Sequence, residues 1–445
     1  MLLLLLGMGK QPVFAQTPAS FSIKDCIDFA SQNNSNIKIS KLDEEIGLQQ
    51  IKEVKGRALP QISGSGSFQK NLKLPRLVLP SGFGGEGGGA ITVGLPYNTG
   101  LTGEATQMLF DPSFNLGLKA AKQTTRLYQQ NTQQVSEQTA YNIASAYYQV
   151  IVVEKQLQLL RSNLTNTRKT LATTELQFKN GVAKRVDVNR LQVNASNLES
   201  QIKQAELNQQ QALNQLKNQM GMPLEQPLAL TDTTLTFSNE EAIPVVTPAE
   251  VYSNRVEVGI LQTNLELQRL DRKNIHSGYF PTLSAFGNYG YTGQGSDFAF
   301  FKTANNDWVA YTTSIVGVRL TIPVFDGFQR KARVQQSRIK ARQLEENLML
   351  TKQNINLELS NAQIQYQNTL QRINAEQQNV ALAQEVYGIT QLEFREGVGT
   401  STDVVEAETS LRQAQNTYIT TLLDLYTARL DLEKAKGNLL SYLNQ

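Results

Sequence analysis

The sequence predicts an α+β protein built from two internal repeats, each with two strands and long coiled-coil helices. The first observation is a repeated segment: LQFKNGVAKRVDV at 176–188 returns as LEFREGVGTSTDV at 392–404, 216 residues later. The second is that apolar residues follow each segment at alternating spacings of three and four, as in a coiled-coil seam. The third is a pair of short alternating segments before each long helical stretch, which is typical of strands.

The composition favours an elongated, solvated assembly over a series of conventional globular cores. Only 40% of the 445 residues are hydrophobic, and Gln, Asn and Ala crowd the helical stretches. The 42 Lys and Arg residues nearly balance the 39 Asp and Glu residues and are interspersed with them, so no nucleic-acid partner is predicted.

The amino-terminal run MLLLLLGMGKQPVFAQ predicts a signal peptide at 1–16, cleaved near Ala15 or Gln16. No later segment has the length and apolar character of a transmembrane helix, so entry into a membrane would require a β-barrel. Cys26 is the only cysteine, which excludes an internal disulfide, and it is interpreted as a packed helix residue.

Helical periodicity, glycine and proline divide the chain into two similar halves. Repeat 1 spans 17–223, with a helix at 22–57, strands at 61–70 and 100–110 around a loop at 71–98, a long helix at 113–180, a tip at 181–186 and a helix at 187–220. A connector, 224–248, leads to repeat 2 at 249–445, with a helix at 249–278, strands at 283–291 and 311–323, a long helix at 327–395, a tip at 396–402 and a helix at 403–441. In each repeat the two shorter helices sum to about the length of the long one, which predicts end-to-end stacking into rods of about 100 Å.

The strands have the height of an outer-membrane barrel, but four strands cannot close one, so oligomerisation is predicted. Alternation predicts one water-facing set, Ser63, Ser65, Thr102, Arg319 and Thr321, and one lipid-facing set, Phe68, Val318 and Leu320. Aromatic residues cluster around the third and fourth strands as at a membrane interface: Tyr289, Tyr291, Phe298, Phe300, Phe301, Trp308 and Tyr311. Ordinary packing within a small sheet is the alternative for this cluster.

The chain resembles the TolC-like outer membrane efflux proteins. The resemblance is carried by the duplicated unit, by Pro60 and Pro281, by LFDP at Leu109 and VFDG at Val324, and by the two tips. It implies a homotrimer whose twelve strands form a β-barrel in outer-membrane lipid, continued by a helical tunnel in the periplasm. It also implies docking with a periplasmic adaptor (membrane fusion) protein and an inner-membrane transporter, and passive conduction of cargo in efflux or type I secretion.

The resemblance implies a periplasmic gate at Asp403 and Glu406, an acidic pair just after the second tip. Three facing copies would repel one another, which is expected to raise some of their pKa values. A simple helix N-cap is the alternative for Asp403. The first tip has Asn189-Arg190 at the matching place, which is not acidic, so only the second tip of each protomer would contribute an acidic ring. Gly399 and Thr400 stand where some relatives have a basic latch residue.

We expect the adaptor to contact the tip residues Gly181, Val182, Gly397 and Val398. The single His276 has no second His or Cys partner for a metal site, and no nucleophile motif is visible, so no catalytic, metal or cofactor residue is predicted. The main alternative function is a structural periplasmic coiled-coil or adaptor protein without a pore. Adaptors, however, have one hairpin, whereas this chain has two, together with strands of barrel length.

Overall fold

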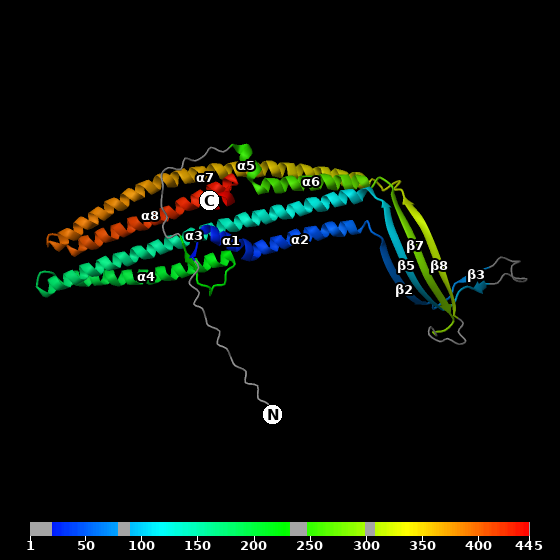
Figure 1. Ribbon diagram of the computed structural model, residues 1–445, viewed down its shortest axis with the longest axis horizontal. Coiled ribbons are helices and arrows are strands. Elements are labelled where there is room, and N and C mark those ends of the chain that lie inside the picture. Colours follow the sequence, from blue (N-terminus) through cyan, green and yellow to red (C-terminus); the bar gives the residue numbers. More distant parts are fainter. Residues whose placement is uncertain (1–19, 79–89, 232–246, 299–307, 445) are drawn as a thin grey trace, which may run out of the picture. The chain divides into compact units, whose positions relative to one another are not determined.

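The computed structural model describes residues 20–78, 90–231, 247–298 and 308–444 (Figure 1). Long helices and one four-stranded sheet make up most of this part of the chain. The described residues fall into two compact units. One comprises those within Met1–Asp43, Tyr128–Leu261 and Asn347–Gln445, and the other those within 44–127 and 262–346. The predicted signal peptide, 1–16, lies outside the described residues.

The sheet has the spatial order β2-β5-β7-β8, and every neighbouring pair is antiparallel. Its strands are β2 (Gln61–Lys70), β5 (Tyr97–Phe110), β7 (Thr282–Gly295) and β8 (Val309–Thr321). The two central strands are longer than predicted, because their pairing continues through Gly- and Thr-containing sequence to Tyr97 and Gly295. The predicted fourth strand, 311–323, is shifted: it ends at Thr321, before Pro323, which has no N–H to donate.

Two short strand pairs lie where the sequence predicts none. Within the predicted loop at 71–98, β3 (Arg76–Val78) pairs with β4 (Ala90–Thr92). In the connector, β6 (Ala229–Leu230) pairs in parallel with β1 (Ser20–Phe21). Segments this short carry too few residues for an alternating pattern to be recognised.

The register places the predicted polar and apolar sets on opposite faces of the sheet. Directly paired residues share a face, and side chains alternate along each strand. The pairs Ser65–Thr102, Thr102–Gly290 and Ser284–Arg319 therefore define one face. That polar face contains Ser63, Ser65, Thr102, Arg319 and Thr321, and the other contains Phe68, Val318 and Leu320.

The predicted aromatic cluster is only partly one group. Phe298 packs edge-on against Phe68 at 5.4 Å between ring centroids, and Trp308 covers Gly293 and Gly295, where any Cβ would meet its ring. Tyr311, in contrast, pairs with Thr292 and lies on the polar face. Phe300 and Phe301 lie outside the described residues.

Nine helices are present in the described ranges. The first half contains α1 (Ile23–Asn33), α2 (Ser35–Gly56), α3 (Pro112–Lys179) and α4 (Arg185–Met220). The second contains α5 (Pro248–Asn254), α6 (Val256–Ser277), α7 (Gln329–Arg395), α8 (Ser401–Lys436) and α9 (Leu439–Leu443). The single helices predicted over 22–57, 249–278 and 403–441 are each two helices.

Helix α4 ends against the break between α1 and α2. The side-chain amide of Asn34 donates to the Gln219 carbonyl at 2.7 Å, and its oxygen accepts from the Asn36 N–H at 2.8 Å to start α2. Gly221 caps α4 at φ 73°, and a Cβ there would lie 2.7 Å from the Asn33 carbonyl oxygen. Only glycine fits both constraints.

The second repeat has the same junction, built from different residues. Gly437 ends α8 at φ 72°, and a Cβ there would lie 2.9 Å from Asn254. The guanidinium of Arg255 donates to the carbonyl oxygens of Lys434 and Ala435 and pairs with Glu257 and Glu358 at 3.0 Å. Arg255 therefore satisfies the carbonyls that a helix end leaves without partners.

The predicted equality of summed helix lengths is confirmed, since α1, α2 and α4 hold 69 residues against 68 in α3, but the end-to-end stack itself is shorter. Together α2 and α4 hold 58 residues against 68 in α3, and α6 with α8 hold 58 against 67 in α7. The stack is therefore ten residues shorter than the long helix in the first repeat and nine shorter in the second, or about 15 Å. In the first repeat the shortfall arises because α1 packs beside the end of α4 through Cys26 and Ala30 and does not extend the rod.

Apolar clusters where the helices meet hold each half together. One joins α1, α3 and α4, and another joins α5, α6, α7 and α8. A third connects the halves, with Ala140 and Ala144 of α3 packed against Leu430 of α8 and against α9. Cys26 is fully buried, as predicted, and burial raises the pKa of its thiol to about 12.

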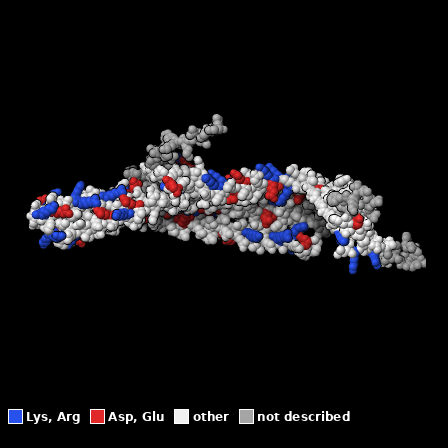
Figure 2. Space-filling model, turned by 90° about the horizontal axis from the view of Figure 1, so that it is seen from below, with Lys and Arg blue, Asp and Glu red and all other residues white. Residues whose placement is uncertain are grey.

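The charged residues on the helical surfaces are of both signs. Figure 2 shows Lys and Arg interspersed with Asp and Glu on one face of the molecule. Among the described helices, none combines the length and apolar character that crossing a bilayer would need.

Candidate functional site: the two hairpin tips

At the first tip, α3 turns into α4 through a compact hydrogen-bonded cap. The Gly181 N–H donates to the Phe178 carbonyl at 3.0 Å, and the Val182 N–H donates to the Gln177 carbonyl at 2.9 Å. Gly181 has φ 77°, so this Schellman-type cap requires glycine or a strained residue. The Val182 side chain is 72% exposed at the end of the hairpin.

The second tip, between α7 and α8, repeats these bonds 216 residues later. The Gly397 N–H donates to the Phe394 carbonyl at 3.2 Å, and the Val398 N–H donates to the Glu393 carbonyl at 3.0 Å. Gly397 has φ 81°, and Val398 is 81% exposed. The repeated sequence thus encodes the same backbone cap, followed at both tips by an exposed valine.

Asp403 lies at the third position of α8 and not at its N-cap, which is Thr400. Its carboxylate accepts from the Thr400 N–H at 3.0 Å and hydroxyl at 2.7 Å, and the Thr400 hydroxyl accepts from the Asp403 N–H at 3.3 Å. The hydroxyl bond to Thr400, followed by the backbone bond, lowers the pKa of Asp403 within one protomer. The N-cap alternative is therefore wrong in detail, because the residue completes a capping box from inside the helix.

Glu406 lies one turn further along α8 and is exposed. It shares with Asp403 a groove of about 410 Å³, whose opposite wall is formed by α7 residues including Leu382 and Val386. Within the described ranges, neither carboxylate forms an ion pair. The predicted gate residues are thus exposed neighbours on one surface.

A buried serine connects the two tips. Ser401, 1% exposed at the start of α8, donates to the Asp187 carboxylate and accepts from the Arg190 guanidinium at 2.7 Å, both from α4. Arg190 and Asp187 are also 3.8 Å apart. The sequence analysis considered Arg190 only as a position where the first tip lacks an acidic residue. Nothing in the neighbouring sequence indicates a hydrogen-bond partner 211 residues away.

A buried acid joins three helices two turns behind the tips. Glu408 of α8 is 3% exposed and is bonded to the Thr167 hydroxyl of α3 and to the Asn194 amide of α4 at 2.9 Å. It lies four residues after Val404 and three before Leu411, which places a carboxyl on the apolar seam of the hairpin. A carboxyl at a seam position is a signal visible in the sequence, and our prediction did not include it.

Hydrogen-bond counting favours a protonated Glu408. The Thr167 hydroxyl also contacts the Asn163 carbonyl at 2.9 Å, yet a hydroxyl has only one proton to donate. If Glu408 carries a proton, it donates to Thr167, and Thr167 donates to Asn163. Burial raises the pKa of Glu408, outweighing the bonds from Thr167 and Asn194 and the charge of Arg412.

We therefore expect Glu408→Gln to be tolerated and Glu408→Ala to destabilise the helical unit by about 1–3 kcal/mol, because the amide can keep both bonds whereas alanine leaves buried polar groups unpaired. The stabilising effect of Glu408 relative to Gln should be fully present below the ordinary pKa of 4.5 and should be lost as the pH rises through the raised folded-state pKa. Unfolding followed by circular dichroism between pH 4 and 8 tests this. A difference between wild type and Glu408→Gln that does not change with pH would contradict it.

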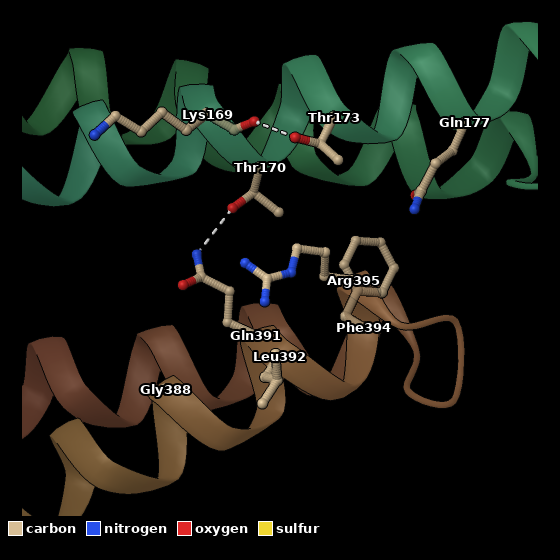
Figure 3. A pocket seen from close by; sticks show the side chains of 9 residues that line it. All are labelled: Lys169, Thr170, Thr173, Gln177, Gly388, Gln391, Leu392, Phe394 and Arg395. Carbon is tan, nitrogen blue, oxygen red and sulfur yellow. Dashed lines mark hydrogen bonds between the residues drawn. The ribbon is translucent and has the colours of Figure 1, made fainter.

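On another side of the tips, α3 and α7 enclose a groove of about 420 Å³ (Figure 3). Gln391 of α7 donates to the Thr170 hydroxyl at 3.2 Å, and Figure 3 shows the Arg395 side chain lying between the two helices. Lys169 adds a second cation to the lining. The described residues contain no group of three His, Cys, Asp or Glu side chains arranged to hold a metal ion.

Comparison with known proteins identifies the family. The family model described as outer membrane efflux protein matches residues 26–222 and 250–438. The chain is 22% identical over 300 residues to the alkaline protease secretion protein AprF of Pseudomonas aeruginosa, covering 66% of this chain and 60% of that protein. It matches 57% of the length of Nodulation protein T of Rhizobium leguminosarum, at 21% identity over 62% of this chain.

Relatives that match over more of the chain, and solved structures, agree with this family match. The outer membrane protein TolC of Escherichia coli is 22% identical over 92% of this chain and 81% of its own length. The CusC structure superposes with a TM-score of 0.72 at 18% identity, covering 96% of this chain and 95% of that one. VceC of Vibrio cholerae gives 0.68 at 15% identity, covering 93% and 96%. The predicted resemblance is confirmed, and this chain belongs to the outer membrane efflux protein family.

Proposed function

We propose that this chain forms the outer-membrane channel of a tripartite efflux or type I secretion system, conducting cargo passively from an adaptor and an inner-membrane pump to the exterior. As a family member it resides in the outer membrane, with its helices in the periplasm. The observation that carries the proposal is a sheet with a polar and an apolar face whose two outermost strands lack a second partner in the described chain. The proposal assigns the chain no catalysis.

Three copies would complete the sheet. Strands β2 and β8 are its two edges and run in opposite directions, so β8 of one copy can pair antiparallel with β2 of the next. Unpaired edges expose N–H and C=O groups that lipid cannot satisfy, and closure of twelve strands removes them. The face with Ser65 and Arg319 would then line the lumen.

Apolar stripes on the helices support the same assembly. On α7, Leu350, Leu357 and Ile364 are seven residues apart and more than half exposed, whereas Ile355 and Leu359 on the opposite side pack in the core. On α4, Val186, Val193 and Leu207 repeat at multiples of seven and are also exposed. Seven-residue spacing is the signature of a coiled-coil seam, so each stripe is suited to a helix of another copy.

The proposed gate is Asp403 with Glu406. Three copies would place six carboxylates around a narrow entrance, where the mutual repulsion could be relieved by widening or by cations. The Arg190–Ser401–Asp187 contact would hold each pair of tips together. The proposed adaptor contacts are Gly181, Val182, Gly397 and Val398, because the two valines are largely exposed in the turns that end the hairpins.

Single-channel recording in a planar bilayer tests the channel and the gate together. The wild-type chain should conduct and should favour cations, and Asp403→Asn with Glu406→Gln should reduce the cation-to-anion permeability ratio several-fold toward one, because the ring loses its charge. A control pair, Glu199→Gln with Glu206→Gln, removes as many charges from ion pairs with Arg168 and Arg161 and should leave selectivity unchanged. Absence of any conductance would refute the channel, and unchanged selectivity in the first variant would refute the gate.

A further inference from the structure

A pocket of about 570 Å³ lies where the helices of the second repeat join the sheet. The end of α6 contributes His276, the following turn contributes Tyr279, and the start of α7 contributes Lys331 and Arg338. Phe328 and Val334 provide apolar lining. All of these residues belong to the unit that contains the sheet. The pocket therefore combines aromatic walls with cations, and its residues lie in sequence just before the start of β7 and shortly after the end of β8.

The cations of this pocket are not neutralised by neighbouring acids. Arg330, next to the pocket, pairs with Asp326 at 3.5 Å and lies over the Tyr279 ring at 5.4 Å. Lys331 lies 5.9 Å from the centre of the Phe328 ring, and neither it nor Arg338 forms an ion pair with any described residue. Two uncompensated positive charges thus border an apolar cavity.

The surrounding sequence is strongly basic. Residues 328–342 contain six cations and no Asp or Glu: Arg330, Lys331, Arg333, Arg338, Lys340 and Arg342. Cations near the amino-terminal end of a helix are disfavoured by the helix dipole, and the first turn of α7 contains no acid. Helix stability does not account for this arrangement, whereas an anionic partner would.

Exposed aromatic side chains lie at the same end of the sheet as the pocket. Phe280, Phe325 and Phe328 are 58%, 76% and 66% exposed, and Phe328 has a positive φ of 63°, a strained value for a phenylalanine. Tyr291 lies on the apolar face near the other end of the sheet, eleven residues after Phe280. That separation is about 36 Å along a strand, or about 28 Å at a 40° tilt, close to the apolar height of an outer-membrane barrel.

We propose that this pocket binds the phosphate headgroup of an anionic phospholipid in the periplasmic leaflet of the outer membrane. Lys331 and Arg338 would contact the phosphate, and Tyr279 and Phe328 would lie along the start of the acyl chains, as aromatic residues do at membrane interfaces. The inference rests on the membrane position of the sheet given under the proposed function. The charge complementarity and the continuity with the apolar face of the sheet favour a lipid over a soluble anion.

The test is native mass spectrometry of the detergent-solubilised full-length protein titrated with phosphatidylglycerol and, separately, with phosphatidylcholine. Lys331→Gln with Arg338→Gln should weaken phosphatidylglycerol binding roughly 30-fold, at about 1 kcal/mol per near-surface cation, and should remove the preference over phosphatidylcholine. Arg333→Gln with Lys340→Gln removes the same charge outside the pocket lining and should retain most of the binding. Lys331→Arg with Arg338→Lys should bind like the wild type.

If both glutamine double variants lose phosphatidylglycerol affinity equally, the effect is due to general surface charge and the proposed lipid site is wrong. Competition by inorganic phosphate at similar concentration would indicate a water-filled anion site, and loss of oligomers in the first pair alone would indicate a subunit contact; either result also overturns it. Bilayer conductance of the same variants separates the two proposals. Lipid binding without conductance would refute the channel alone, and conductance without phosphatidylglycerol binding would refute the lipid site alone.

Discussion

Replacing Leu357 with aspartate is expected to convert the protein from trimers to monomers and thereby to abolish conductance. Leu357 is 60% exposed on α7 and lies on the side of the helix opposite Ile355 and Leu359, which are buried in the chain's own core. In the proposed assembly its burial contributes about 2 kcal/mol in each copy, and an aspartate there would bury an unpaired charge at a larger cost.

Size-exclusion chromatography with multi-angle light scattering measures the outcome, and circular dichroism checks that the helices remain folded. Leu357→Met preserves the apolar volume and should stay trimeric. Gln367→Asp places the same charge on an exposed position roughly 80° around the helix and should also stay trimeric. A folded Leu357→Asp trimer that still conducts would show that this stripe is not a subunit interface.

The sequence predicted the elements well because their signals are local and long. Helices of 67 and 68 residues without proline after the first turn, and strands with alternating polarity, need no tertiary information to be recognised. The tips were recognised for the same reason, since the duplicated segment contains both the capping glycine and the acid of the following helix.

The breaks at Asn34 and Arg255 could not be predicted in this way. Each residue occurs in a sequence that otherwise continues helical, and each adopts an extended backbone. The side chain of each bonds to the end of another helix, 185 residues away for Asn34 and 179 for Arg255. Because the sequence does not show which helix end will arrive there, the breaks were missed, and so was the true length of the stacked rods.

The residues of the candidate site also differ in whether the sequence alone could indicate them. Asp403 and Glu406 were proposed from the family resemblance, and their placement on one exposed surface needed only helical periodicity. Ser401 and Glu408 were missed because their bonds cross between the two repeats. For Glu408 a signal existed, a carboxyl on an apolar seam, and a polar residue at such a position commonly fixes register in coiled coils.

The tips offer the sharpest test of partner docking, because their exposed valines make no evident contribution to the fold. Val182→Glu combined with Val398→Glu should abolish export while trimers and bilayer conductance persist. Both side chains are more than 70% exposed, so a charge there costs the folded chain little, whereas an apolar contact with an adaptor hairpin would be lost. The readout is export, in cells lacking their own channel, of the compounds found to depend on the wild-type chain.

Two further variants separate docking from folding. Val182→Ile with Val398→Ile keeps the apolar surface and should export normally. Gly397→Val leaves Val398 in place but strains the cap, since a branched residue at φ 81° costs about 1–2 kcal/mol, so it should lower stability first. Loss of trimers in the double glutamate variant would give the valines a structural role, and undiminished export would place the adaptor contact elsewhere, with the Lys169–Arg395 groove as the next surface to examine.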